Sequence, residues 1–247
     1  MSYNKIYKVN FGGIDLSTLF SLDGRLSVCA GLVRQGARLA DVGTDHAYLP
    51  VWLAKNGVIS SAVASDVREK PLASGAENIE RYDCADIVST RLCNGLDGIS
   101  ANEADDIVMA GMGGELICDI IGRAPWLKDP EKRLILQPMT KAHTLRQYLS
   151  ENGFELLSET PCAHGGKSYT VIHAAYTGNA FTPSMPFCYI GKLENDGSLA
   201  RDYMQNILSK LVKKRRGVSL GGGDTTPYDE VIAEIKNRFG VDIHDDR

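Results

Sequence analysis

The chain has 247 residues, enough for one large α/β domain or for a medium domain with an appendage, and its 43% apolar and 23% charged residues are typical of a globular protein. A formal net charge of −4 argues against a protein that coats nucleic acid through bulk electrostatics. No stretch reaches the roughly 18 to 20 apolar residues of a membrane span, and residues 1–10 lack the apolar core of a signal peptide, so we expect a cytoplasmic protein without membrane contact.

The predicted elements begin with a lead-in helix, because apolar residues recur at helical spacing between Leu16 and Gly36. Short apolar runs then alternate with helical stretches, a pattern that predicts a parallel sheet with crossover helices. Two final runs are joined through Gly165 and Gly166 without an intervening helix, so we expect them to pair antiparallel. The predicted strands are Arg38 to Val42, Ser61 to Asp66, Ile87 to Leu92, Asp106 to Ala110, Arg133 to Gln137, Phe154 to Thr160 and Tyr169 to Tyr176.

Five β-α units followed by a hairpin favour the methyltransferase variant of the doubly wound sheet, with seven mostly parallel strands, over a dehydrogenase sheet of six parallel strands. Between Thr177 and Gly191 the composition shifts to Gly, Pro, Thr and Asn, which predicts a linker. Two amphipathic helices follow, the first around Leu208 and ending at Gly217, the second around Ile235. We therefore expect a Rossmann-like α/β domain over residues 1–177 and, over residues 178–247, a helical hairpin that is an appendage without a core of its own.

The loop after the first strand, Gly43-Thr44-Asp45-His46, lies where an open α/β sheet binds its ligands, at the carboxyl ends of the strands. It lacks the G-x-G-x-x-G spacing of a pyrophosphate-binding turn, and Asp45 stands where that turn has its second glycine. A carboxylate there would repel a phosphate but not a cationic ligand. S-Adenosylmethionine carries a sulfonium and an ammonium and no phosphate, so the charge pattern favours it over NAD.

Two further strand ends carry candidate ligand-binding groups. Asp66 follows the second strand and lies 23 residues beyond Gly43, close to the roughly 20-residue spacing at which an acidic residue meets a ribose diol. The fourth strand is followed by Gly111-Met112-Gly113-Gly114, and its three glycines let a flat ligand approach the backbone. The six cysteines are scattered without metal-ligand spacing, so we expect no metal site, and His143 and His173 are interpreted as structural.

Several segments of the chain together match one known family pattern. The most specific are ARLADVGTDHAYLPVWLAKNG and IVMAGMGGELI, and AVASDV, NGLDGI, RLILQPM and LRQYLSENGF agree with them. From Leu22 to about Ala174 the chain thus resembles the bacterial methyltransferases that modify N1 of adenine at position 22 of tRNA. The resemblance implies a class I methyltransferase domain with a C-terminal helical coiled-coil extension, S-adenosylmethionine as the cofactor and tRNA as the partner.

The resemblance also implies roles for individual residues. Gly43, Asp45 and His46 would form the cofactor loop. Asp66 would bind the ribose, while Asn94 with Gly95 would lie at the adenine end of the cofactor, although the family commonly has an aspartate in place of this asparagine. The implied cofactor-binding residues are Arg25, Asp41, Gly43, Asp45, His46, Asp66, Asn94, Gly95, Gly111, Gly113 and Gly114, and the implied catalytic residues are Asp45, His46 and Gly113.

N1 of adenine already presents a lone pair, so its methylation requires no prior loss of a proton. Catalysis would then rest on desolvation and on in-line positioning, which can supply roughly 7 to 11 kcal/mol. Gly111 to Gly114 occupy the place of the Asn/Asp-Pro-Pro-aromatic loop found in enzymes that methylate the exocyclic amine, which weighs against that reaction. We expect Asp45 to orient the base or to stabilise the positive charge of the product, and the tRNA base to be exposed by local opening.

The basic cluster of the C-terminal part allows two interpretations. It could contact tRNA phosphates, or it could be a solvated helix end placed against the negative end of the helix dipole. Two alternatives to a tRNA methyltransferase also stay open, namely an NAD-dependent dehydrogenase and a cofactor-binding or RNA-binding module without turnover. No obligatory protein partner is indicated. The basic cluster comprises Lys210, Lys213, Lys214, Arg215 and Arg216.

Overall fold

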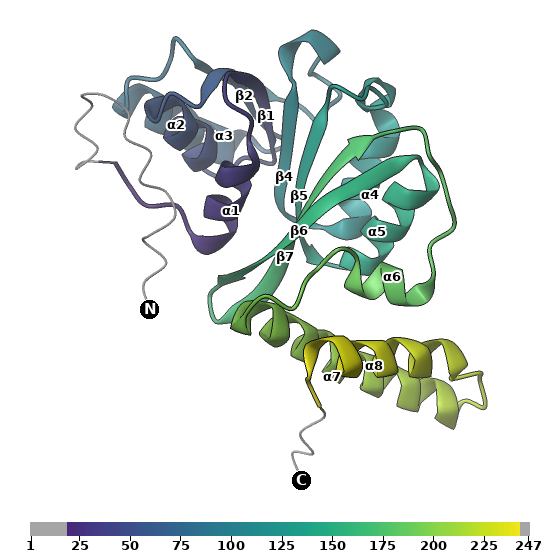
Figure 1. Cartoon of the computed structure of the whole chain (residues 1–247). Helices are drawn as coiled ribbons and strands as arrows, with labels where there is room; N and C mark the ends of the chain where they lie inside the picture. The colour runs from purple at the N-terminus through teal and green to yellow at the C-terminus, as the bar shows by residue number, and fades with distance from the viewer. Residues whose placement is uncertain (1–18, 243–247) are drawn as a thin grey trace.

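A seven-stranded sheet forms the centre of the computed structural model, which describes residues 19–242 (Figure 1). The strands are β1 Ala37–Val42, β2 Ile59–Asp66, β3 Val88–Leu92, β4 Asp106–Gly113, β5 Arg133–Thr140, β6 Phe154–His164 and β7 Lys167–Tyr176. Their order is β3-β2-β1-β4-β5-β7-β6, with β1 to β5 parallel and β7 antiparallel to both of its neighbours. This confirms the prediction of seven mostly parallel strands in a Rossmann-like domain.

The strands differ from the prediction mainly at their ends. β4 and β5 each continue three residues beyond the predicted ends, so that Gly111 and Gly113 belong to β4 and not to a loop after it. Register shifts around Met112 show that this extension is bulged. β6 and β7 meet at a two-residue turn of Gly165 and Gly166, both with positive φ, which confirms the antiparallel hairpin.

Helices cover both faces of the sheet (Figure 1). One face carries α1 Gly24–Leu32, α2 Tyr48–Lys55 and α3 Glu69–Arg81; the other carries α4 Gly114–Arg123 and α5 Ala142–Glu151. Alternate strand residues face opposite sides, so Leu39 lies in the core beneath α1 to α3 and Ala40 in the core beneath α4 and α5. Two short 3-10 helices, Ala101–Glu103 and Pro125–Leu127, lie in the connections that precede β4 and β5.

The lead-in helix is shorter than predicted. It begins at Gly24, because the side chain of Asp23 accepts hydrogen bonds from the backbone N–H groups of Arg25 and Leu26 and caps the helix. Residues 19–22 are not helical, and the predicted start at Leu16 lies outside the described residues. The start of the helix is therefore set by the cap at Asp23 and not by the apolar residues that precede it.

The C-terminal part contains α6 Met185–Ile190, α7 Ser198–Leu220 and α8 Thr226–Phe239. α6 lies within the segment predicted to be a linker, and its residue Ile190 is fully buried. α7 continues through Gly217 to Leu220, whereas the prediction ended it at the glycine. Within residues 19–242, no helix combines the length and the apolar character needed to cross a membrane.

The expectation of an appendage without a core is wrong. Buried apolar side chains from α6, α7 and α8 form a cluster of their own, separate from the two clusters beside the sheet. Met204, Leu208, Val231 and Ile235 are fully buried within it. α6 contributes to this cluster because it packs against α8 as well as against α5. The division of the chain between residues 177 and 178 stays a prediction.

A buried ion pair lies where the sheet meets the C-terminal helices. The side chains of Arg146 in α5 and Glu159 in β6 are 1% and 0% exposed, and Arg146 Nη2 lies 2.8 Å from Glu159 Oε2. Arg146 Nη1 also donates to the backbone oxygens of Cys188 and Tyr189, at 2.9 and 3.0 Å. The backbone N–H of Lys192 donates to Glu159 Oε1 at 3.1 Å. The pair therefore bonds the sheet domain to α6 and to the segment that leads into α7.

Candidate active site

The loop after β1 lies against the ends of β2 and β4. The backbone N–H groups of Gly43 and Thr44 both donate to Ser65 O at 2.8 Å, which holds the loop over the end of β2. Gly43 has a φ of +72°, and a Cβ at this position would lie 2.1 Å from Met112 Cε. The backbone conformation therefore favours glycine here, whereas the contact is with the end of a flexible side chain that can move aside.

Two non-glycine residues of this loop adopt the left-handed backbone conformation. His46 and Ala47 have φ values of +63° and +53°. Asn78 of α3 is buried and donates from Nδ2 to His46 O at 2.9 Å, which supports the strained backbone. Asp45 is 77% exposed in its side chain, with Oδ1 3.4 Å from His46 Nε2. Backbone strain of this kind concentrates at functional sites, and here it accompanies an exposed carboxylate at the ligand-binding edge of the sheet.

Asp66 ends β2, and its side chain is 5% exposed. Oδ1 of Asp66 accepts hydrogen bonds from Arg68 N at 2.8 Å and from Arg68 Nε at 3.3 Å. No donor among residues 19–242 is hydrogen-bonded to Oδ2, which leaves one carboxylate oxygen for a ligand hydroxyl. Arg68 is 69% exposed and is a polar group at this position that the sequence analysis did not include.

Asp41 is a buried residue near the end of β1, with 6% of its surface exposed. Burial raises the pKa of its carboxyl to about 6, because the charged form is poorly solvated there. Three other buried polar atoms near the strand ends, Thr44 Oγ1, Ser65 Oγ and Arg25 Nε, have no hydrogen-bond partner in the described part of the chain. Buried polar atoms are normally paired, so a group of unpaired ones is an unusual feature of this edge.

Arg25, Gln137 and Gly111 meet where β4 ends. Gln137 is fully buried, and its Oε1 accepts hydrogen bonds from Gly111 N at 3.1 Å and from Arg25 Nη1 at 3.4 Å. Arg25 Nη1 also lies 3.4 Å from Met139 Sδ. Gly111 has a φ of +83°, so Gln137 holds a bulged, left-handed stretch of backbone in place. The structure thus brings Arg25, which is distant in sequence, beside the predicted glycine segment.

The two later glycines of this segment differ in their surroundings. A Cβ on Gly114 would lie 2.4 Å from Lys141 O, because the connection from β5 to α5 passes directly over the start of α4. This packing accounts for Gly114 without any ligand. A Cβ on Gly113 would lie 3.3 Å from Thr140 Oγ1, a less severe contact. Packing does not account for glycine at positions 111 and 113, so Gly111 and Gly113 are the candidates for a functional role.

Asn94 and Gly95 follow β3 and lie beside α4. Asn94 is exposed, and its Oδ1 accepts a hydrogen bond from Arg123 Nη2 at 3.3 Å. Gly95 has a φ of +62°, and a Cβ there would lie 2.9 Å from Ile120. Arg123 also forms an ion pair with Asp97. The amide of Asn94 is therefore oriented by an arginine of the neighbouring helix.

Besides Arg68, three residues of this edge had no predicted role, namely Asn78, Arg123 and Gln137. Each acts on a segment far away in the chain: Asn78 on the β1 loop, Arg123 on Asn94 and Gln137 on Gly111. The sequence offers one sign of such a residue, which is a polar side chain at a position expected to be buried in its helix or strand. Asn78 and Gln137 are of this kind. A single sequence does not show which backbone group such a residue will meet.

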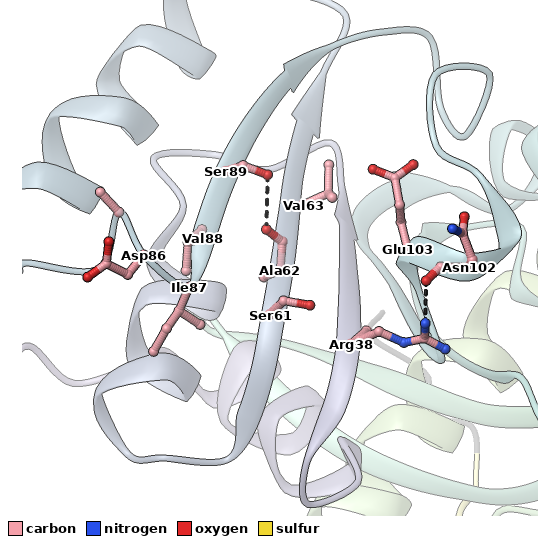
Figure 2. A pocket seen from close by; sticks show the side chains of 11 residues that line it. Arg38, Ser61, Ala62, Val63, Asp86, Ile87, Val88, Ser89, Asn102 and Glu103 are labelled. Carbon is pink, nitrogen blue, oxygen red and sulfur yellow. Dashed lines mark hydrogen bonds between the residues drawn. The ribbon is translucent and has the colours of Figure 1, made fainter.

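A hollow of about 370 Å³ lies on the amino-terminal half of β1 to β3, away from the strand ends described above. Figure 2 shows the side chains that line it, with Ser89 Oγ donating to Ala62 O at 3.3 Å and Arg38 donating to Asn102 O. None of the predicted site residues lines this hollow. Because open α/β sheets bind ligands at the carboxyl ends of their strands, the candidate active site is the opposite edge.

The fold and the site together define a class of enzyme. The strand order, the antiparallel β7 and the polar, glycine-containing carboxyl edge are those of a class I methyltransferase domain. Consistently, a family model described as a methyltransferase domain matches residues 22–172. More closely, the chain belongs to the bacterial tRNA (adenine(22)-N1)-methyltransferase family, as the comparisons below show.

A tRNA (adenine(22)-N(1))-methyltransferase of Bacillus subtilis (strain 168) is 34% identical over 171 residues, which are 66% of this chain and 72% of that protein. The crystal structure of the B. subtilis m1A22 tRNA methyltransferase TrmK matches with a TM-score of 0.73 at 28% identity, over 89% of this chain and 96% of that chain. The M. capricolum TrmK structure, in complex with the cofactor product S-adenosyl-homocysteine, has a TM-score of 0.68 at 25% identity, over 90% and 95% of the two chains. The structural matches thus extend beyond the residues of the domain model.

Proposed function

We propose that this protein transfers a methyl group from S-adenosylmethionine to N1 of adenine 22 in tRNA. The observation that carries the proposal is the similarity to the B. subtilis enzyme of that name, which covers 72% of the relative. The methyltransferase model spans residues 22–172 and so includes every residue of the predicted cofactor set. The same activity agrees with the polar carboxyl edge of the sheet.

The strand ends fit S-adenosylmethionine in several respects. Gly43 leaves room beside Met112, and Asp66 has a carboxylate oxygen that can accept a hydrogen bond from a ribose hydroxyl. Asn94 and Gly95 would flank the adenine. The cofactor supplies an electrophilic methyl group on a sulfonium sulfur, which keeps the electron pair of the broken bond. The M. capricolum relative, bound to S-adenosyl-homocysteine, supports S-adenosylmethionine as the cofactor.

The loop residues would act on the target base by position and charge. N1 attacks with its own lone pair, so no side chain has to remove a proton first. The base becomes positively charged on methylation, and the exposed carboxylate of Asp45 would stabilise that charge or orient the base. His46 would hold Asp45, since its Nε2 lies 3.4 Å from Asp45 Oδ1, and Gly113 would leave space where the base meets the methyl group.

The tRNA partner is proposed to contact the basic residues of α7 in part. Arg215 of this cluster already pairs with Asp229 of α8 at 2.9 Å, and Lys214 Nζ lies 5.4 Å from the ring centre of Tyr228. The members of the cluster therefore have different surroundings, although they are adjacent in sequence. The cluster is Lys210, Lys213, Lys214, Arg215 and Arg216.

The test supplies unmodified tRNA transcript and methyl-labelled S-adenosylmethionine and maps the labelled nucleoside. We expect N1-methyladenosine at position 22, and no label in a matched transcript that carries guanine there. Label at another position, or none in any tRNA, would contradict the proposal. Calorimetry with NAD is the control for the dehydrogenase alternative, and we expect binding heat only with S-adenosylmethionine.

Asp45→Asn separates positioning from proton removal. We expect this variant to keep its affinity for cofactor and tRNA and to retain measurable, slower methyl transfer, because the amide still orients the base but no longer offers a charge. Asp45 would instead be a general base if two results are obtained. The variant loses all turnover while it keeps both affinities, and the wild-type pH profile has a steep acid limb.

A further inference from the structure

A cleft of about 700 Å³ lies between the methyltransferase domain and α7. One wall is the end of β5 with the start of α5, a second is the β6–β7 turn, and the third is α7, which runs beneath the sheet in Figure 1. The arrangement is stabilised at its base by Arg146, which lines the cleft and is held by the buried pair with Glu159. The cleft thus lies at the junction between the two parts of the chain, beside the buried ion pair that joins them.

The charge of this cleft is opposite to that of the whole protein. Four lysines line it, Lys141, Lys167, Lys210 and Lys214, and no aspartate or glutamate is among its lining residues. Within residues 19–242, Lys167 and Lys210 have no carboxylate oxygen within ion-pair distance, whereas Lys141 pairs with Glu115. Burial and the nearby cations, Lys214 first among them, lower the pKa of His143 in the same wall. A chain with a net charge of −4 therefore concentrates unpaired positive charge here.

The structure divides the basic run of α7 into groups with different surroundings. Lys210 and Lys214 are four residues apart, share one helix face and line the cleft. Arg215 is bonded to Asp229 of α8. Lys213 and Arg216 are exposed but do not line the cleft. Proximity in sequence therefore does not make these residues one binding surface.

The cleft adjoins the site proposed for methyl transfer. Its lining includes Met139 and Thr140 at the end of β5. Thr140 is the partner of Gly113 in the β4–β5 ladder, and Met139 Sδ lies 3.4 Å from Arg25 Nη1. A polymer whose target group lies at Gly113 would therefore continue into the cleft.

Aromatic rings also lie in the lining of the cleft, where Tyr189 is 8% exposed and His143 and Tyr169 are half-buried. His143 stacks on Tyr189 with ring centres 4.6 Å apart and planes inclined by 5°, and Tyr169 lies in the same lining. Cationic grooves with aromatic side chains are typical of surfaces that bind single-stranded or distorted nucleic acid, because lysines contact phosphates and rings stack on bases. An acidic peptide would use the charges but not the stacked rings.

We propose that this cleft binds the sugar-phosphate backbone of the tRNA strand next to the target adenine, with Lys167 on one wall and Lys210 and Lys214 on the other. This inference rests on the proposed function and adds the RNA path to it. It assigns tRNA binding to a surface that neither part of the chain forms alone, and it leaves Lys213 and Arg216 outside the contact.

The experiment compares two double variants of one helix with the same change of charge. Lys210→Gln with Lys214→Gln removes the cleft cations of α7, and Lys213→Gln with Arg216→Gln is the matched control. Affinity for unmodified tRNA transcript is measured between about 50 and 200 mM salt. We expect the cleft variant to bind about tenfold more weakly, with the slope of log K against log salt reduced by about one per lost phosphate contact. We expect the control to change affinity less than about twofold.

A third variant, Lys167→Gln, tests the opposite wall, which is remote from α7 in sequence. It should also weaken tRNA binding and lower the salt slope. Affinity for S-adenosylmethionine and the thermal unfolding curve should match the wild type for all three variants, which shows that the fold is intact. Equal losses in the cleft and control variants, or an unchanged salt slope in the cleft variants, would overturn the inference.

The outcome is independent of where the methyl group goes. If the wild type methylates a position other than adenine 22 while the cleft variants bind tRNA more weakly than the control, the proposed function fails and the RNA path stands. If adenine 22 is methylated and the two double variants behave alike, the function stands and the path fails.

Discussion

Glu159→Ala would leave the guanidinium of Arg146 buried without its counter-charge. Both side chains are at most 1% exposed, and three N–H···O contacts of 2.8 to 3.1 Å join them. Removing one partner of such a pair costs about 3 to 5 kcal/mol of the free energy of unfolding. The substitution also removes the hydrogen-bond acceptor of the Lys192 N–H and of the Thr170 hydroxyl, which both donate to Glu159 in the wild type. Since a domain is stable by about 5 to 15 kcal/mol, this is a large fraction of the total.

The matched control lies on the same strand and at the same junction. Glu155 of β6 pairs with Lys192 Nζ at 3.3 Å, but the two side chains are 51% and 42% exposed. Glu155→Ala should therefore cost less than about 1 kcal/mol. Equilibrium unfolding in urea, followed by far-ultraviolet circular dichroism, measures both variants. If Glu159→Ala costs no more than Glu155→Ala, the buried pair does not stabilise the junction more than an exposed pair does.

A double variant distinguishes the buried charge from lost packing. Arg146→Met with Glu159→Leu removes both charges, so no uncompensated ion remains in the junction. It leaves the Cys188 and Tyr189 carbonyls without their Arg146 donor, at about 1 to 3 kcal/mol. We expect the double variant to be more stable than Glu159→Ala. A double variant that is less stable would show that the lost hydrogen bonds and packing, and not the buried charge, dominate.

Three further predictions concern the candidate active site. Gly43→Ala should weaken S-adenosylmethionine binding, because alanine is strained at a φ of +72° and its Cβ would displace the end of the Met112 side chain beside the cofactor loop; isothermal titration calorimetry measures it. Asp41→Asn should stabilise the unliganded protein above pH 6 by up to about 3 kcal/mol, since the rise in pKa from 3.8 to about 6 is a cost of burying the charge. Gln137→Leu should slow single-turnover methyl transfer about tenfold, because Gly111 N–H loses its acceptor.

Each of these predictions has a control. Gly36→Ala shares a positive φ of +77° but meets no atom within 4 Å, so it should leave cofactor affinity unchanged; equal effects at Gly43 and Gly36 would exclude the steric argument. The advantage of Asp41→Asn should vanish below about pH 3, where the carboxyl is neutral in both the folded and the unfolded wild type. An advantage that does not depend on pH would contradict the burial argument. Gln137→Glu keeps the acceptor and should be faster than Gln137→Leu.

The strands could be predicted because their signal is local. Apolar runs such as Arg38 to Val42 are bounded by turn residues, and the two-residue turn of Gly165 and Gly166 selects an antiparallel hairpin. The order of elements along the chain then limits the sheet to very few topologies. The ends of the helices were harder to predict. Asp23 caps α1 through its side chain, and the spacing of apolar residues contains no information about such a cap.

The six-residue helix α6 could not be predicted either, and here the reason is its dependence on tertiary packing. A helix of that length is not stable in isolation, so its existence depends on packing against α5 and α8. Its sequence, which begins after Ser184 and contains a proline, reads equally well as a linker. The same packing turns the expected appendage into a unit with its own buried cluster.

The residues at the strand ends could be predicted from the order of the elements along the chain, because the carboxyl ends of parallel strands must meet at one edge. Asp45, Asp66 and Gly111 follow from that rule alone. The hydrogen bond from Gly111 to Gln137 and the packing that requires Gly114 could not be predicted, since these contacts join elements far apart in the chain. The tertiary structure likewise decides which basic residues of α7 line the cleft, because neighbours on a helix point in different directions and only the docking of the helix selects one face.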